Sequence, residues 1–466
     1  MVLVSTLTVV RSPNSTSEPP GPRLPKSLTL AGFFLFREKM LSRLHSRYGD
    51  AFSIDLPLFG PSVILSNPAY VKRLFQAKPD EVAFGERSPL GKVLGPGSLF
   101  SLDGAEHLAE RRLILPAFHG ERMKSYEGII EEETLKEIDS WPEGREFPTL
   151  EPFMRITLNS ILRAVFGAEG KDVAALAKVL PGFVTLGSRL SLIPPLQRDL
   201  GRFSPGGRLN RMRARYDAII DRMIDAHLAD PRLEERDDVM SLLLRAHYDD
   251  GSSMSRTAIS DELLTLLAAG HETTATSLAW TVDRLRRHPW ILHRLEEEAD
   301  AGGKELRMAT IHEVQRTRPV IAGTSRYALR DFELGEWLIP KGRQIVVSAA
   351  MIHKDERFFE RPLQFEPDRF VGTKPDTYTW VPFGGGTRRC PGAAFAHMEM
   401  DIVLRTLLQH FDLMTTTKPD ERWRDRGIAF APADGGLAVV RRRQVAAEPK
   451  AGRNSGPADA GLAAAA

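Results

Sequence analysis

A single cysteine inside a glycine-rich decapeptide constrains this chain more than any other feature. Cys390 is the only cysteine among 466 residues, so it has no partner for an internal disulfide bond. It cannot build a zinc or iron–sulfur site either, because those sites need several cysteines at set spacings. A lone thiolate can still serve as the single axial ligand of a haem iron. The segment around it reads Phe383-Gly384-Gly385-Gly386-Thr387-Arg388-Arg389-Cys390-Pro391-Gly392.

The residues beside Cys390 favour a haem ligand over the ordinary alternative, a buried cysteine that packs as a small hydrophobic side chain. The glycines allow the backbone to pass close to a flat ligand and to direct N–H groups at the sulfur. Such hydrogen bonds hold a thiolate and tune the iron. Arg388 offers a fixed charge suited to a haem propionate. We therefore interpret Cys390 as the axial ligand of a haem iron.

The pattern Phe383-x-x-Gly386-x-Arg388-x-Cys390-x-Gly392 resembles the haem-binding loop of the cytochrome P-450 superfamily, the haem-thiolate monooxygenases, and in particular the soluble bacterial type. The resemblance implies a mainly α-helical fold with small β-sheets. In that fold, haem b (iron protoporphyrin IX) lies between a long central helix and the helix that follows the cysteine. The resemblance extends in order over about residues 20–443 and rests on four separate motifs.

Residues 258–288 predict an apolar helix with polar residues at its middle. An acid and hydroxyl groups inside such a helix need hydrogen-bond partners, and Thr273 can bond back to a carbonyl and open the helix. Glu272 and Thr273 would then form a proton route beside a buried cavity. The family has an Ala/Gly-Gly-x-Asp/Glu-Thr signature over the haem, which implies that Glu272 relays protons and Thr273 holds oxygen or a water. A zincin motif is excluded, because Ala275 stands where the second histidine is needed.

Two further positions carry cations that the resemblance assigns to the haem. His107 and Arg111 are four residues apart in an expected helix, so they share one face and can grip a carboxylate. Without Cys390, both would be read as solvated surface residues. The resemblance implies that His107, Arg111, Arg326 and Arg388 bind the haem propionates.

Glu313 and Arg316, three residues apart on an expected helix, can form an ion pair. In isolation such a pair is usually a surface feature worth little stability. The resemblance implies instead a buried structural pair behind the haem loop, joined by Arg369. Thr317 stands where the family usually has an aliphatic residue, which leaves the helix boundaries before Glu313 open.

Two loop regions allow two interpretations each. Residues 83–100 are either an apolar cluster under a long loop or a loop over the haem, and residues 183–200 are either a surface helix–loop–helix or a mobile lid. The resemblance assigns seven apolar residues to a substrate pocket: Phe84, Leu94, Leu266, Ala269, Val320, Ile321 and Ile428.

Composition adds expectations about organisation and location. The net charge of +2 is too small to indicate nucleic-acid binding, and one cysteine fits a reducing cytoplasm. The apolar runs at 1–10 and 30–36 are shorter than the ~20 residues of a membrane span, so we expect no transmembrane anchor. We expect a flexible Pro/Ser-rich leader at 1–27, one domain at 28–445 and a disordered tail at 446–466.

Local patterns predict several further elements. Residues 51–56 and 61–66 are typical of a hairpin, and a short helix should follow the capping residue Asn67. We expect a helix from Ala393 to His410 behind the haem. We also expect 121–228 to be mostly helical, with breaks at Trp141-Pro142, Gly144, Pro181-Gly182, Pro194-Pro195 and Pro205-Gly206-Gly207.

The function implied is insertion of one oxygen atom from O₂ into a lipophilic small molecule, such as a fatty acid, terpenoid or steroid. The chain has no nucleotide-binding glycine fingerprint and no iron–sulfur cysteines. Electrons would therefore come from a ferredoxin or flavodoxin with its reductase. Two alternatives remain open: a peroxide-driven peroxygenase or isomerase of the same fold, and a non-catalytic haem-binding protein. Glu272-Thr273 argues against the first alternative.

Overall fold

The computed structural model describes most of the chain. The ranges that it describes are residues 17–22, 25–56, 60–85, 87–120, 122–167 and 170–443. The expected disordered tail lies outside the described residues, as do most residues of the expected leader.

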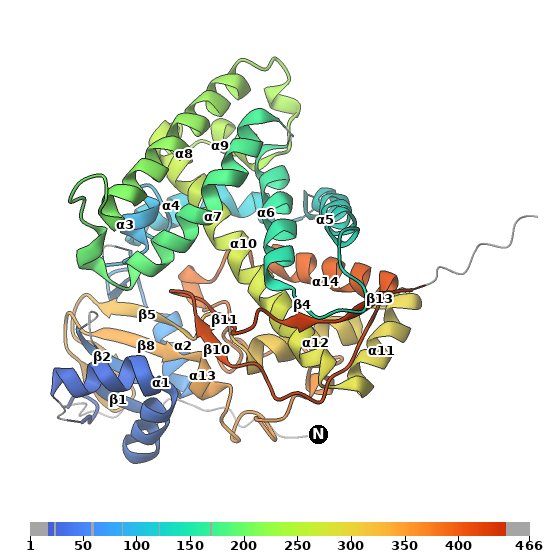
Figure 1. Ribbon diagram of the computed structural model, residues 1–466. Coiled ribbons are helices and arrows are strands. Elements are labelled where there is room, and N and C mark those ends of the chain that lie inside the picture. The colour runs from blue at the N-terminus through green and yellow to red at the C-terminus, as the bar shows by residue number, and fades with distance from the viewer. Residues whose placement is uncertain are drawn as a thin grey trace, which may run out of the picture.

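The fold is mainly helical, as predicted (Figure 1). The helices are α1 (Lys26–Tyr48), α2 (Pro68–Phe75), α3 (Gly91–Leu94), α4 (Gly104–Ile114), α5 (Arg122–Ile138), α6 (Leu150–Phe166), α7 (Lys171–Ser191), α8 (Pro205–Leu228), α9 (Val239–Arg245), α10 (Arg256–Arg286), α11 (Pro289–Asp300), α12 (Glu305–Thr317), α13 (Ala349–Ile352) and α14 (Ala393–His410).

The strands are short and form a few small sheets. Their bounds are β1 (Ala51–Leu56), β2 (Gly60–Leu65), β3 (Val82–Ala83), β4 (Phe147–Pro148), β5 (Gly323–Ala328), β6 (Phe332–Leu334), β7 (Trp337–Ile339), β8 (Gln344–Ser348), β9 (Phe411–Leu413), β10 (Trp423–Asp425), β11 (Phe430–Pro432), β12 (Leu437–Ala438) and β13 (Val440–Arg442).

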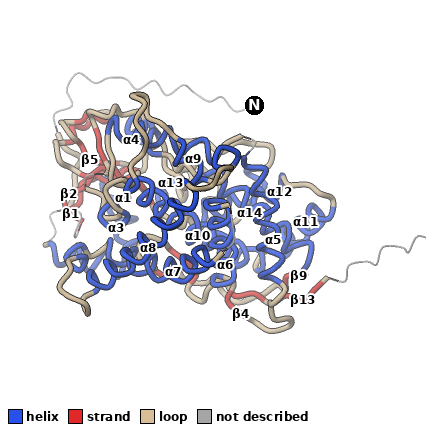
Figure 2. Tube along the Cα trace, turned by 90° about the horizontal axis from the view of Figure 1, so that it is seen from above, coloured by secondary structure: helices blue, strands red, loops and turns tan. Residues whose placement is uncertain are grey.

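The largest sheet has five strands in the order β1-β2-β8-β5-β3. Only the β2–β8 pair is parallel, and β5 pairs with β8 in a register that sets Arg326 opposite Ile345. The sheet lies at one end of the molecule, on the left in Figures 1 and 2, and helices form the remainder. Residues 323–326 of strand β5 line the cavity that is described below.

Helix α10 runs through the centre of the helical part (Figure 1) and packs against α6, α8, α12 and α14. It begins after Ser255, whose side chain accepts a hydrogen bond from the Ala258 N–H and so caps the first turn. Its side chains are buried on nearly all sides, and the buried residues include polar ones, such as Asp261 and Glu262, as well as apolar ones. This burial makes α10 the element around which the other helices are arranged.

Several local predictions are confirmed. Strands β1 and β2 form the expected antiparallel hairpin, α2 is capped by Asn67, and α14 has the predicted bounds. Residues 17–22 lie against the large sheet, where Ser53 donates its N–H to the carbonyl of Pro20 across 2.8 Å.

The predicted break at Pro181-Gly182 is wrong, because both residues lie inside α7. Proline removes one helical hydrogen bond, and the burial of Leu180 and Phe183 on either side offsets that loss. Within the described part of the chain, α7 is the one helix long and apolar enough to span a membrane by length and composition. It packs against α8 and carries Phe183 to an internal cavity.

Candidate active site

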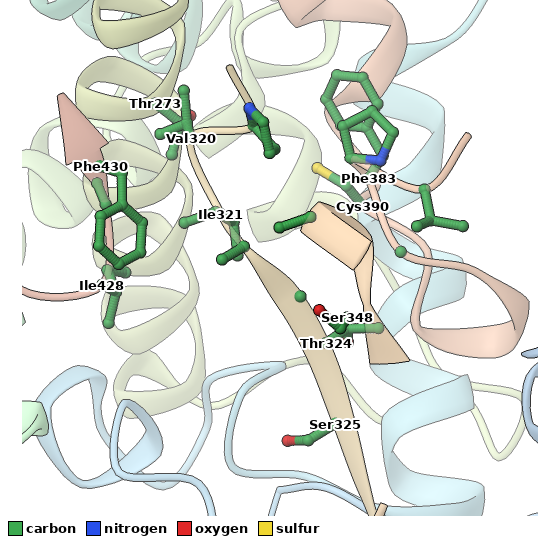
Figure 3. A pocket seen from close by; sticks show the side chains of 18 of the residues that line it. Thr273, Val320, Ile321, Thr324, Ser325, Ser348, Phe383, Cys390, Ile428 and Phe430 are labelled. Atoms are coloured by element: carbon green, nitrogen blue, oxygen red, sulfur yellow. The ribbon is translucent and has the colours of Figure 1, made fainter. Parts of the chain in front are cut away.

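A large cavity of about 2120 Å³ lies between α10, α7, α1, strand β5 and the loop before α14. Every apolar residue predicted for the substrate pocket lines this cavity, as do Glu272, Thr273 and Cys390. In Figure 3, the Cys390 sulfur and the Thr273 side chain approach one space from two different elements, with Val320 and Ile321 along its border. Residues far apart in the sequence thus meet at one site.

The loop before α14 holds Cys390 by its backbone. The Cys390 N–H donates to the carbonyl of Phe383 across 3.0 Å, which closes the loop on itself. Gly385 and Gly386 have a further role in packing. A Cβ on Gly385 would meet the ring of Phe75 at 2.1 Å, and one on Gly386 would meet the Phe75 carbonyl oxygen at 2.1 Å. These glycines therefore allow α2 to support the loop from behind.

The Cys390 side chain is open to the cavity, while protein surrounds the residue on its other sides. Burial raises the pKa of its thiol, and a hydrogen bond from the Gly392 N–H and the charges of Arg111 and Arg389 oppose that rise. Gly392 also lines the cavity, and a Cβ there would meet no protein atom within 4 Å. The space beside the sulfur is therefore free of protein side chains.

Arg326, on β5, lies at the cavity wall and is buried. It donates to the carbonyls of Ser325 at 2.7 Å and of Gly385 at 3.1 Å. Burial, with a smaller contribution from the charge of Arg388, lowers the pKa of Arg326 to about 9. Crowded, desolvated cations of this kind are stabilised by an anionic ligand.

Arg388 reaches across the cavity to the segment before α4. It donates to the carbonyl of Leu99 at 2.8 Å, and it also bonds the carbonyl of Leu102 and the carboxylate of Asp103. His107 and Arg111, on α4, line the same cavity as Arg326 and Arg388. Burial lowers the pKa of His107 to about 3, with the charges of Arg388 and Arg111 adding to the effect, so its imidazole is neutral near pH 7.

Thr273 and Glu272 lie at the middle of α10. The Thr273 hydroxyl donates to the carbonyl of Ala269 at 2.7 Å, the local bond expected of a threonine that can open a helix. Glu272 is buried and accepts a hydrogen bond from Arg426 Nε at 2.9 Å. Arg426 belongs to the loop between β10 and β11. The predicted acid–threonine pair therefore has a cationic partner from the C-terminal part of the chain.

Glu313, Arg316 and Arg369 come together behind the Cys390 loop. Arg316 bonds both carboxylate oxygens of Glu313 at 2.7 Å, and both side chains are fully buried. Arg369 Nε approaches the same carboxylate at 3.3 Å. Arg316 also donates to the carbonyls of His353 and Pro362. The Glu313–Arg316 pair thus joins α12 to two loops. Further hydrogen bonds hold both members in place, from Arg316 to the two carbonyls and from Arg369 to Glu313.

The loop between α3 and α4 is fastened to the first turns of α10. Asp261 accepts the Gly97 N–H at 2.8 Å, and Glu262 accepts the Leu99 N–H at 2.9 Å. Thr265 donates to the Ser98 hydroxyl at 2.7 Å. Because the carbonyl of Leu99 also accepts from Arg388, this loop joins α10 to the Cys390 loop.

Comparison with known proteins identifies the family and supports the fold. A family profile described as "Cytochrome P450" matches residues 19–437. The chain belongs to the cytochrome P450 family. This P450 is 50% identical over 439 residues to a protein named "Putative cytochrome P450 138" in Mycobacterium tuberculosis and Mycobacterium bovis. The match covers 94% of this chain and 99% of the relative.

Two further comparisons agree with this assignment. A protein named "Putative cytochrome P450 135B1" from Mycobacterium tuberculosis is 36% identical, with 92% of each chain covered. The structure titled "Retinoic acid bound cyanobacterial CYP120A1" superposes with a TM-score of 0.80, covering 92% of this P450 and all of that chain. At 23% identity, this likeness bears on the fold alone. The predicted fold class and the predicted enzyme class, a P450 monooxygenase, are both confirmed.

The residues of this P450 fit the haem that its family uses. Cys390 offers one thiolate at the edge of an open space, and the glycine at 392 leaves room beside it. Arg326 and Arg388, with Arg111 and His107, place cations and a neutral imidazole on the same cavity. That set suits a flat apolar ring with two carboxylate arms, which would offset the crowded positive charge.

Sequence reasoning missed Arg426 as the partner of Glu272 and missed Asp261, Glu262 and Arg213 as the residues that fasten the loop above the cavity. Arg426 is 154 positions from Glu272, so no helical or strand spacing relates them. Arg213 bonds Asp261 and also donates to the Leu94 carbonyl at 2.8 Å. The one available signal was the pair of adjacent acids at 261 and 262 in an otherwise apolar helix.

Proposed function

We propose that this P450 inserts one oxygen atom from O₂ into a lipophilic small molecule, in the class of fatty acids, terpenoids or steroids, using haem b and electrons from a separate redox protein. The observation that carries the proposal is the shared cavity. Its wall carries Cys390 and Thr273 together with Val320, Ile321 and Ile428. An apolar cavity with a few convergent polar groups is suited to a lipophile.

The roles of the residues follow from their placement. Haem held by a thiolate supplies oxygen activation and oxygen-atom transfer. Cys390 would hold its iron through the thiolate, and His107, Arg111, Arg326 and Arg388 would bind its propionates.

Thr273 would hold a water or oxygen beside the reacting carbon through its hydroxyl, which now bonds the Ala269 carbonyl. Glu272 would accept a proton at its carboxylate from outside and pass it toward Thr273. The apolar wall would position the substrate and exclude bulk water. Glu313, Arg316 and Arg369 would keep the Cys390 loop in place from behind.

The redox partner is proposed to be a ferredoxin or flavodoxin that is reduced by its own reductase, in the cytoplasm. The chain has no flavin or nicotinamide fingerprint. The exposed Arg389 is adjacent to Cys390 in the loop before α14, so an acidic electron carrier would meet positive charge there.

The deciding experiment measures turnover of the substrate with electrons from a defined donor system. Purified haem-loaded protein would be screened for ligand-induced spectral shifts with fatty acids, terpenoids and steroids. The best binders would then be incubated with NAD(P)H, a ferredoxin and a reductase. We expect an oxygenated product whose added atom comes from ¹⁸O₂. Product formed only with added peroxide would instead assign the peroxygenase function, and no product under either condition would favour a non-catalytic role.

A further inference from the structure

Arg37, on α1, brings a cation to the cavity wall in addition to those assigned to the haem. Its guanidinium carbon lies 4.3 Å from the centre of the Phe430 ring, which is the geometry of a cation–π contact. Arg37 and Phe430 both line the cavity, as does Ile428. Ile428 lies in the loop between β10 and β11, and Phe430 begins β11. A cation from the first helix therefore lies beside the predicted substrate wall.

The neighbours of Arg37 show an inverted arrangement of polarity. Phe36 is 60% exposed, whereas Arg37 is half-buried. Phe36 has φ −140° and ψ 31°, outside the α-helical region, so α1 is bent at this residue. An exposed phenylalanine next to a cation turned inward is the reverse of what their transfer free energies favour. Departures of this kind are expected at functional sites.

The charges around Arg37 leave its guanidinium suited to a further anion. Burial lowers the pKa of Arg37, and the charges of Asp425 and Glu38 oppose that effect. Both acids are exposed, and each has another partner: Asp425 accepts the Gly427 N–H at 2.7 Å, and Glu38 bonds Lys354. A carboxylate that a ligand brings into the cavity would reduce the cost of burying the cation.

Arg37 and Cys390 belong to two different parts of one cavity. Figure 3 shows Phe430, the ring against which Arg37 lies, on one side and the Cys390 sulfur on the other, with Ile321 and Val320 between them. The side chains between the two parts are apolar and suit a hydrocarbon. A ligand held by Arg37 at one end would therefore extend its apolar body past Phe430 toward Cys390.

We propose that Arg37 binds the carboxylate of the substrate, so that the substrate is a lipophilic carboxylic acid whose other end lies beside the haem. The proposal rests on the proposed monooxygenase function and narrows its substrate class, because neutral terpenoids and steroids lack the anion. Arginine forms bidentate hydrogen bonds with a carboxylate, and stacking on Phe430 holds its planar fork in one orientation. Oxygen insertion is then expected at carbons far from the carboxylate.

The test measures binding to the full-length haem-loaded protein without reductant, so that the result does not depend on turnover. Dodecanoic, hexadecanoic, abietic and cholanic acids would each be compared with their methyl esters, by ligand-induced spectral shifts and by isothermal titration calorimetry. We expect the best acid to bind about 10-fold more tightly than its ester. Arg37→Gln should remove that preference by weakening the acid about 10-fold and the ester less than about 2-fold.

Matched variants separate Arg37 from other cations. Arg43→Gln changes an exposed arginine of α1 outside the described cavity wall, and Arg422→Gln changes an exposed arginine that lines the cavity. Both should keep the wild-type ratio of acid to ester affinity. Asp425→Asn should act in the opposite direction and tighten the acid about 3-fold, because it removes a competing carboxylate and keeps an acceptor for the Gly427 N–H.

Three binding results would overturn the proposal. Wild-type protein could bind no acid more tightly than its ester, the acid preference could be lost in Arg422→Gln and kept in Arg37→Gln, or Asp425→Asn could leave acid affinity unchanged. Turnover is measured separately with the same acids and esters. An acid that binds through Arg37 and gives no product would contradict the monooxygenase function and leave the carboxylate site in place. Equal turnover of acid and ester that Arg37→Gln does not change would contradict the carboxylate site alone.

Discussion

Arg426 donates a hydrogen bond to the buried carboxylate of Glu272 across 2.9 Å. This contact joins the loop between β10 and β11 to the middle of α10. The same loop is held to α7, because Ile428 donates its N–H to the Ser188 hydroxyl at 3.1 Å. Arg426 orients Glu272, and the position of the loop that carries Arg426 depends in turn on its contact with α7.

Changing Arg426 to Gln should leave the Glu272 carboxylate without its cation. A buried carboxylate that loses a charged partner costs about 1–3 kcal/mol, and Glu272 would no longer be held in one orientation. We expect a lower midpoint of thermal unfolding and a larger solvent deuterium isotope effect on turnover. Arg424→Gln, an exposed position two residues earlier, is the control. Equal behaviour of the two variants would show that the Glu272 contact has no role.

Thr273→Ala should separate substrate binding from oxygen use. The substitution removes one hydroxyl and keeps most of the packing volume, so substrate affinity should change little. Coupling should fail, with NAD(P)H consumed and peroxide released in place of product. The measurement is the ratio of product to NAD(P)H consumed, with Thr281→Ala, two turns further along α10, as the control. An unchanged ratio in Thr273→Ala would remove that hydroxyl from the mechanism.

Cys390→Ser should abolish the thiolate-ligated spectrum of the haem-loaded protein, because no other cysteine exists in the chain to replace the ligand. The readout is the absorption of the reduced carbon-monoxide complex. A variant that still absorbs at the thiolate position would contradict the assignment of Cys390. The exposed Arg389→Ala variant, next to it in the loop, should keep the wild-type absorption.

Arg369→Ala removes one of the two cations that contact the buried Glu313 carboxylate. Leaving a buried charge less well paired should cost about 3 kcal/mol and reduce the yield of haem-loaded protein. Arg294→Ala breaks an exposed pair with Asp368, which should cost less than about 1 kcal/mol. Denaturant unfolding of both variants checks the difference. Equal stabilities would mean that Arg369 is dispensable for the structure behind the haem loop.

Glu262 should make the stability of the protein depend on pH. Burial, helped by the charges of Glu110 and Asp261, raises the pKa of Glu262 to about 8. The pKa of an unfolded glutamate is near 4.5. Between these values the folded state holds a proton that the unfolded state releases, so this contribution to stability is complete below pH 4.5 and is lost as the pH rises through 8.

Glu262→Gln cannot titrate and can still accept the Leu99 N–H. The variant should match the wild type below pH 4.5 and exceed it by about 4 kcal/mol near pH 8. Free energies of unfolding measured across that range would check this, with the exposed Glu305→Gln as the control. Parallel pH profiles of wild type and Glu262→Gln would show that Glu262 is not held in its protonated form.

The sequence predicted the parts of the site that depend on short-range spacing. The Cys390 loop, the polar centre of α10 and the helix α14 all have local signatures, and the structure places them around one cavity. What it could not predict depends on side chains that meet only after folding. Arg426 and Glu272 have no shared period, and the Phe75 ring that requires Gly385 comes from a helix over 300 positions earlier.

Pro181 shows where a prediction from local sequence fails. Pro181 reads as a helix break because it removes a hydrogen bond, yet α7 continues through it. The burial of Leu180 and Phe183 is a tertiary effect, and tertiary packing overrides local propensity where enough apolar area is buried. At Pro205 the same residue type begins α8, a position where its missing N–H costs nothing.

The packing of Phe75 against Gly385 and Gly386, and the bonds from Arg388 to Leu99 and Leu102, also bear on biosynthesis. One part of the site, with Phe75, Leu99 and Leu102, belongs to the first ~100 residues of the chain, whereas its partners in the Cys390 loop are synthesised near the end. No nascent chain that lacks the C-terminal segment has the complete set of contacts. The complete set of contacts around a cofactor therefore requires a chain that has been synthesised at least through the Cys390 loop.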